Sequence, residues 1–246
     1  MARPAGNSRA LLWSYVARII TGGAASLWAS GWPSPPPALV ALVFWTLANV
    51  LCEILWLPAP EGRGYLSMAT AANFATLLVL PPGAAIATTA LAGGLADAVF
   101  RRRRWYQVLF NMGMTSISVA AASQVFTALG GVRGGADEIL SPLNALPLLL
   151  SAATFFLANT WLVTGVVAIS QGGSFPEVWR TQFAFNYALL GAVVLLVLGY
   201  FFAILFLTWG YLSAFLAAAT AYFVRDAYGR FVREMTEPHP TLGPTP

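Results

Sequence analysis

Three ionisable residues fall inside long apolar stretches of the sequence: Arg18, Glu53 and Asp97. An unpaired charge at membrane depth costs at least about 2.5 to 3.5 kcal/mol, so such residues are functional candidates by default. On membrane-spanning helices all three would lie within about two turns of the same membrane face, and Asn111 would join them. We therefore expect one intramembrane polar layer. In its functional interpretation, Arg18 bridges the two carboxylates at a pocket open towards the cytoplasm or at a coupling site.

A simpler interpretation of this layer needs no ligand. Asp97 would pair with the arginines that follow it, and Glu53 would pair with Arg18 or extend towards water. The asparagines, including the deeper Asn49 and Asn73, would form hydrogen bonds between helices. The sequence favours this interpretation and leaves the pocket open as the alternative.

The block Arg101, Arg102, Arg103 and Arg104 is followed at once by Trp105. Arginines near a membrane surface attract anionic headgroups by about 1 kcal/mol each, and tryptophan prefers the interface. The block therefore predicts a topological anchor in contact with anionic lipid. A specific lipid or partner site is the alternative.

The inventory of reactive residues excludes several mechanisms. All 13 basic residues are arginines, so P-loop and Schiff-base lysines are absent. One cysteine, Cys52, and one histidine, His239, are present, too few for a disulfide, a Cys/His zinc cluster or an intramembrane Ser-His-Asp triad. We expect no metal and no cofactor. A non-enzymatic role is favoured, and the pair of Glu53 and Asp97 leaves an enzyme open.

The elements that carry these residues follow from composition. Hydrophobic residues make up 58% of the 246 residues and charged residues 9%, against about 25% charged residues in ordinary soluble domains. The prediction is an all-α polytopic helical membrane bundle of about eight transmembrane helices, within a range of six to eight. Apolar windows place the spans near residues 11–31, 37–57, 66–80, 84–100, 106–129, 144–169, 182–206 and 211–226.

Three of these spans carry further expectations. The third and fourth are short and are separated by Pro81-Pro82-Gly83, so they predict a tight hairpin buried in the bundle. The last apolar run is too long for one crossing, and we divide it at Trp209-Gly210, with Gly199-Tyr200 as the alternative. The first span contains Arg18, which argues for a retained helix over a cleaved or interfacial segment.

The arginines also set the orientation, because cytoplasmic loops are rich in arginine and lysine. Eight spans with the N-terminus inside place eleven of the 13 arginines on one side, leave Arg18 in the membrane and put Arg133 alone outside. We therefore expect a multi-pass protein of the cytoplasmic (inner) membrane with both termini cytoplasmic. The net charge of +4 is then explained by arginines in the loops on one side of the membrane, and no nucleic acid partner is expected.

This topology divides the chain into three parts. Residues 1–10 form a cytoplasmic N-terminus, and residues 11–226 form the helical transmembrane domain. Residues 227–246 form a cytoplasmic helical extension followed by a disordered, proline-rich tail. Apart from the lipid bilayer, any partner would have to act from the membrane or the cytoplasm.

A set of short motifs then resembles a known kind of membrane region. The motifs are Glu53-Ile-Leu-Trp-Leu-Pro58, Gly64-Tyr-Leu-Ser67, Pro82-Gly83-Ala-Ala, the arginine block, Leu109-Phe-Asn111 and Leu129-Gly-Gly131. Over residues 40–225 they resemble the multi-span N-terminal sensor region of bacterial HD-GYP, GGDEF and histidine-kinase signalling proteins. The output domain of such proteins is missing from this sequence, so the resemblance implies a sensor-like or ligand-binding module that signals through a separate partner.

A weaker similarity gives the alternative. A small bundle with a short hairpin and a glycine-rich loop at residues 130–143 also resembles the substrate-binding S-components of energy-coupling-factor transporters. That similarity implies transport of a small solute together with an energising module.

Overall fold

The computed structural model describes residues 6–58, 65–182 and 186–236. Arg3, Arg63 and the expected disordered tail lie outside these residues. The described elements, in chain order, are α1 (Gly6–Ser30), α2 (Leu39–Ile54), β1 (Trp56–Pro58), β2 (Tyr65–Ser67), α3 (Ala69–Val79), α4 (Pro82–Leu95), η2 (Ala96–Phe100), α5 (Trp105–Ala128), α6 (Ala136–Leu140), η3 (Pro142–Asn144), α7 (Ala145–Gln171), α8 (Phe175–Gln182), α9 (Asn186–Trp209), η4 (Gly210–Leu212) and α10 (Ser213–Thr236).

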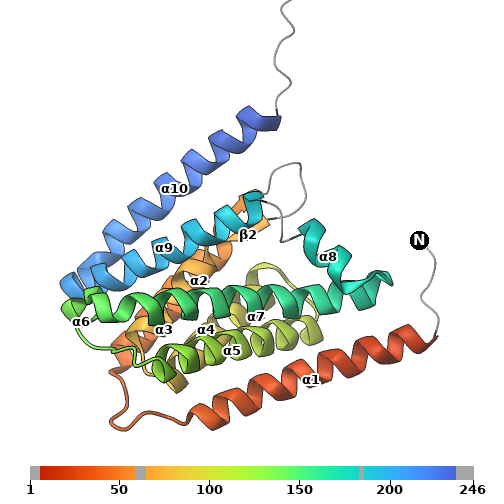
Figure 1. The fold of residues 1–246 in the computed structure, drawn as a ribbon, viewed down its shortest axis with the longest axis horizontal. Helices are drawn as coiled ribbons and strands as arrows, with labels where there is room; N and C mark the ends of the chain where they lie inside the picture. Colours follow the sequence, from red (N-terminus) through yellow and green to blue (C-terminus); the bar gives the residue numbers. More distant parts are fainter. Residues whose placement is uncertain (1–5, 59–64, 183–185, 237–246) are drawn as a thin grey trace, which may run out of the picture.

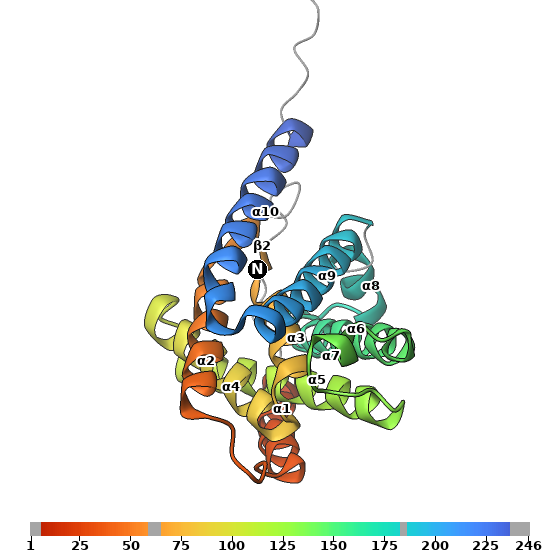
Figure 2. The same ribbon diagram turned by 90° about the vertical axis from the view of Figure 1, so that its left-hand side faces the viewer.

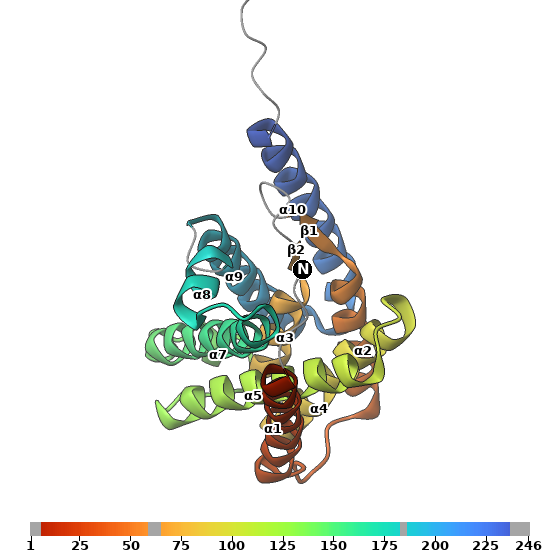
Figure 3. The ribbon, with the colours of Figure 1, turned by 90° about the vertical axis from the view of Figure 1, so that its right-hand side faces the viewer.

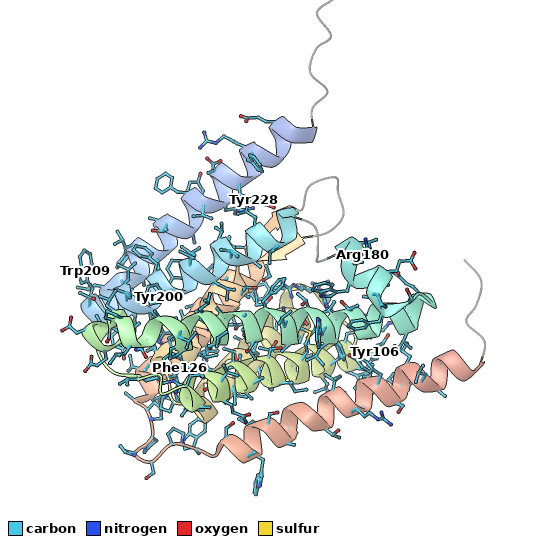
Figure 4. All side chains as sticks on the ribbon, in the orientation of Figure 1. Tyr106, Phe126, Arg180, Tyr200, Trp209 and Tyr228 are labelled. Atoms are coloured by element: carbon cyan, nitrogen blue, oxygen red, sulfur yellow. The ribbon has the colours of Figure 1, made fainter. Side chains whose placement is uncertain are left out.

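The long helices run back and forth between two ends of the molecule (Figure 1). Tyr106 and Arg180 lie at one end, and Phe126 and Trp209 lie at the other (Figure 4). We call the first the arginine end, because Arg180 lies there and the arginine block comes directly before Trp105 and Tyr106 in the chain. In the described part of the chain, five segments are long and apolar enough to cross a membrane and two apolar helices, α2 and α3, are shorter. The chain is therefore a multi-pass, all-α membrane protein, and the predicted fold class is confirmed.

The predicted central hairpin is present as α3 and α4. Of the eleven residues of α3, nine are buried, and most of α4 is buried as well. The turn between them begins α4 with Pro82, which is suited to the first turn of a helix. A side chain at Gly83 would overlap the carbonyl oxygen of Gly31 at the end of α1, so only glycine allows this turn to pack there.

Helix α1 is held in the bundle by close backbone contact with α5. A Cβ atom on Gly23 would lie 2.4 Å from Cα of Gly113, and one on Gly113 would lie 2.6 Å from the carbonyl oxygen of Ile19. Small residues at such crossings let membrane helices approach until their backbones touch. The hydroxyl of Tyr15 also donates to the carbonyl of Leu162 on α7 at 3.0 Å.

The loop at the end opposite the arginine block is ordered by two polar side chains. Arg133 donates to the carbonyl of Leu77 and to the hydroxyl of Ser123, and lies 4.7 Å from the ring centre of Phe126. Burial lowers the pKa of Arg133 to about 10, which leaves it charged at neutral pH. Asn144 bonds both backbone groups of Val132, accepting from its N–H at 2.9 Å and donating to its carbonyl at 3.0 Å.

The last apolar run divides at Trp209-Gly210, as predicted. There α9 ends, Gly210 takes a φ of +59°, and the short turn η4 leads into α10. Helix α10 diverges from the bundle (Figures 2 and 3), while it packs on α9 and beside β1.

The structure also contains elements that the spans did not predict. Strands β1 and β2 pair antiparallel, so α2 ends before the predicted residue 57 and α3 begins after the predicted residue 66. Residues 175–182, expected in a loop, form α8, a short amphipathic helix. Windows of about 19 residues average over such short features.

Candidate functional site

The end of α4 turns into a π-helix that presents Asp97. Residues Ala96–Phe100 form this turn, η2, and the amide of Arg101 donates to the carbonyl of Ala96 five residues back. Such π-helical turns are rare and occur often at functional sites. Arg102 then takes a φ of +48°, an uncommon conformation for a residue with a side chain. The chain reverses here, and both Arg101 and Arg103 reach back to Asp97.

Asp97 is the centre of a polar cluster. Its side chain is 1% exposed and accepts hydrogen bonds from Arg101 Nη1 at 2.8 Å and from the amide of Asn111 on α5. It also forms an ion pair with Arg103, whose Nε lies 3.3 Å away. Loss of these partners would leave a buried carboxylate without compensation, which is strongly destabilising. The π-helical turn, the arginine block and α5 are therefore joined through one side chain.

Arg101 extends the cluster to α2. Its Nη2 atom lies 2.7 Å from Oε2 of Glu53 and also donates to the backbone carbonyl of Glu53. Burial acts to lower the pKa of Arg101, but its hydrogen bonds to Asp97 and Glu53 outweigh burial and raise it above its usual value. Ser67 of β2 donates to the same Glu53 oxygen at 3.4 Å.

The predicted bridge through Arg18 is wrong. The side chain of Arg18 is exposed on α1, and the cation between Glu53 and Asp97 is Arg101. Arg18 lies on a face of α1 that does not turn towards the cluster, which hydropathy alone could not reveal. The i, i+4 spacing of Asp97 and Arg101 was the available signal, since residues at this spacing share one side of a helix.

A cavity of about 950 Å³ adjoins this cluster, and we call it the central cavity. Its walls come from α1, α3, α5, α7 and the region of α2, β2 and η2 at the arginine end. Glu53, Asp97 and Asn111 line it and Arg18 does not. Three of the four residues of the predicted polar layer thus meet at one cavity, together with Tyr106 at the arginine end (Figure 4).

The deeper asparagines differ in their bonding. Asn49 donates to the carbonyl of Trp45 at 2.7 Å and to the hydroxyl of Thr76 at 2.8 Å, so it links α2 to α3. Asn73 is only 8% exposed and lines the cavity, yet its amide has no hydrogen-bond partner among the described residues. An amide offers two donors and an acceptor, and one that opens onto a cavity can bond to a molecule within it. The amide of Asn73 is therefore available to a molecule in the cavity.

The arginine block does not act as one unit. Arg101 is 15% exposed and lies within the cluster, whereas Arg103 is 42% exposed and reaches Asp97 from the surface. Arg102 and Arg104 are exposed or partly exposed, and the ring of Trp105 is 68% exposed. Only the outer members of the block are thus placed to meet lipid headgroups.

The reactive groups of the described residues show no metal centre. Within residues 6–58, 65–182 and 186–236, no three His, Cys, Asp or Glu side chains gather in a way that could hold an ion. Cys52 is a free, buried thiol on α2.

The fold and this cluster define a polytopic membrane protein with a polar cavity near one membrane face. Comparison with protein families is consistent with that class: the model of the MASE9 family matches residues 40–225. The chain belongs to the MASE9 family of membrane-associated sensor domains, found as N-terminal sensor regions of signalling proteins. No curated protein and no solved structure matches the chain.

The family match covers the same residues as the resemblance drawn from the short motifs, which is therefore confirmed. It begins after α1 and includes the cluster of Glu53, Asp97, Arg101 and Asn111. The transporter alternative receives no support from the comparisons.

Proposed function

We propose that this chain is a ligand-binding sensor module whose signal leaves through a separate partner protein. The observation that carries the proposal is the position of the Asp97 cluster: it lines the central cavity and ties together η2, α2 and α5. A ligand that fills the cavity packs against Asp97 and Arg103, which line it, and so acts on the bonds between these elements. Ligand binding thereby becomes a change in how they pack.

A contiguous route leads from the cluster to α10. Arg101 holds both the carboxylate and the backbone carbonyl of Glu53, one residue before α2 ends at Ile54. Strand β1 follows directly, and α10 lies beside β1. A shift of Arg101 therefore acts on the end of α2, on β1 and so on α10. Polar networks and packed elements with two arrangements are the physical carriers of such coupling.

The orientation of the module is part of the proposal. Arg180 and Tyr106, which directly follows the arginine block and Trp105, lie at one end of the bundle (Figure 4), and Arg133 belongs to the loop at the other. Under the positive-inside rule the arginine end faces the cytoplasm. Both termini and the end of α10 would then be accessible to a cytoplasmic partner.

The test combines purification of the chain from native membranes with two matched variants. We expect a kinase or a nucleotide-signalling enzyme to co-purify, and its activity to differ between the wild-type chain and Arg103→Gln. Arg103 is suited to this test because its pair with Asp97 is long and half exposed, so its loss disturbs the cluster at little cost to folding. Asp137→Asn, an exposed change in the opposite loop, is the control.

Two outcomes would contradict the proposal. One is co-purification with an ATPase-containing energising complex, which would indicate transport. The other is partner activity that is the same with Arg103→Gln, Asp97→Asn and the wild type, compared at equal amounts of folded chain. The second outcome would leave the cluster with a purely structural role.

A further inference from the structure

Uncharged polar side chains gather in the inner part of the central cavity. Asn73 of α3 is nine-tenths buried and unbonded among the described residues. Thr70 of α3, Thr115 of α5 and Asn159 of α7 line the same cavity, and no side-chain hydrogen bond is formed by any of the three within the described part of the chain. Amides and hydroxyls that satisfy one another need no ligand, whereas these leave donors and acceptors for a neutral polar group.

The outer part of the cavity has a different character. Arg9 of α1 and Arg104 at the start of α5 line it, and neither pairs with a carboxylate among the described residues. Within the described part of the chain, the guanidinium of Arg104 donates to the hydroxyl of Tyr106 at 3.4 Å. Arg101 and Arg103, in contrast, are engaged by Asp97. Two arginines without counter-charges favour an anionic group at the mouth of the cavity.

Apolar and aromatic side chains line the same cavity, beside the Asp97 cluster. They include Val16, Phe110, Met114 and Val166. Tyr106 and Thr115 are nine residues apart on α5, which corresponds to about 14 Å along the helix. The cavity is thus long enough for an extended molecule with an apolar body.

We propose that the central cavity binds an elongated organic acid, with its acidic group at Arg9 and Arg104 and a neutral hydrogen-bonding group at Asn73 and Asn159. This inference rests on the proposed function and names the class of its ligand. An unsubstituted fatty acid would leave the Asn73 amide unbonded against its tail, and a neutral diol would leave the two arginines without an anion. The acid has both groups, and its body matches the apolar walls.

Four ten-carbon probes of comparable length test this proposal. The full chain in lipid nanodiscs is equilibrated with labelled 10-hydroxydecanoate, decanoate or 1,10-decanediol, and empty nanodiscs measure partitioning into lipid. We expect 10-hydroxydecanoate to bind about fivefold to tenfold more tightly than decanoate, the effect of about one hydrogen bond, and more tightly than the diol. A fourth probe, 10-hydroxydecyl phosphate, is compared with 10-hydroxydecanoate. The one that binds more tightly shows whether the site prefers a phosphate or a carboxylate.

Variants assign the two ends of the ligand. Asn73→Leu should remove the preference for 10-hydroxydecanoate over decanoate. Asn159→Leu, at a half-buried site, should have the same effect and serves as the test if Asn73→Leu disturbs the folding of α3. Replacing Arg9 and Arg104 together by Gln weakens both acids by the same factor and leaves the diol unchanged. Thr154→Val, on α7 outside the cavity lining, is the control. The proposal is overturned if 10-hydroxydecanoate, decanoate and 1,10-decanediol bind equally, or if none binds more than to empty nanodiscs. The polar groups of the cavity would then be hydrated and would not bind such a ligand.

The two proposals fail in different ways. If no probe binds while Arg103→Gln still alters the activity of the partner, the ligand class is wrong and the sensor function remains. If 10-hydroxydecanoate binds as expected while the cluster variants leave the partner unchanged, the binding site remains and the sensor function is wrong.

Discussion

Two Asp–Arg ion pairs at i, i+4 spacing lie in the described part of the chain, one buried and one exposed. Substitution of the two aspartates therefore measures how much burial contributes to the stability of such a pair. Asp97 is 1% exposed and Arg101 is 15% exposed, whereas Asp226 is 40% exposed and Arg230 is 63% exposed. Asp→Asn keeps the size of the side chain and removes its charge. The first substitution leaves Arg101 with less counter-charge in a buried site, while the second leaves Arg230 in contact with solvent.

The two substitutions should differ by several kcal/mol. Removing one partner from a buried ion pair costs about 3 to 5 kcal/mol, and Asp97 also pairs with Arg103 and accepts a hydrogen bond from Asn111. The exposed pair on α10 is worth about 0.3 to 0.5 kcal/mol. At about 2 to 4 °C per kcal/mol for a chain of this size, we expect Asp97→Asn to lower the midpoint of thermal unfolding by roughly 10 °C, and Asp226→Asn by less than about 2 °C.

The assay is thermal unfolding of both variants in the same detergent, followed by the loss of monodisperse protein in gel filtration. Asn111→Leu, which removes one donor to Asp97, should give an intermediate decrease. Equal midpoints for Asp97→Asn and Asp226→Asn would refute the reasoning, because they would mean that the buried cluster contributes no more than a surface ion pair.

Three further outcomes follow from the packing. Gly113→Ala forces a methyl group against the carbonyl of Ile19 and should lower the free energy of unfolding by about 1 to 3 kcal/mol. Gly229→Ala, with open space around it, is the control and should be neutral or stabilising by up to about 1 kcal/mol. Equal thermal shifts for the two variants would contradict the close contact of α1 and α5. Asn49→Leu should lower the unfolding free energy by about 1 kcal/mol through the lost bond to α3, and an unchanged midpoint would show that this bond is not stabilising. The proposed orientation places the loop of Val132 outside the cell, and Val132 is exposed. In a Cys52→Ala background, the thiol of Val132→Cys should therefore react with an impermeant maleimide added to intact cells. Reaction in inside-out vesicles alone would show that the orientation is the reverse.

The sequence was sufficient for the features that depend on composition and on turns. Apolar content predicted a helical membrane protein, Pro81-Pro82-Gly83 predicted the buried hairpin, and Trp209-Gly210 predicted the break before α10. These features are local, because prolines, glycines and long apolar runs restrict the backbone wherever they occur. The strands of residues 56–58 and 65–67 and the short helix α8 were missed, since they are shorter than the window that defines a span.

The site was only partly predictable for a related reason. Membrane depth placed Glu53, Asp97 and Asn111 in one layer, and the structure brings them to one cavity. Depth says nothing about the direction in which a side chain points around its helix, so Arg18 was expected in the cluster although it faces outward. The reversal of the chain at Arg102, which turns Arg101 towards Glu53, has no signature in hydropathy.

The central cavity and the proposed opening of its arginine end to the cytoplasm can be tested with one cysteine. The lone thiol Cys52 is removed by Cys52→Ala, and Thr115→Cys places a new thiol in the cavity lining. A charged, membrane-impermeant methanethiosulfonate should modify this thiol in inside-out vesicles and leave it intact in whole cells. Modification from the outside of whole cells, or no modification in either preparation, would contradict a water-accessible sensor cavity on the cytoplasmic side.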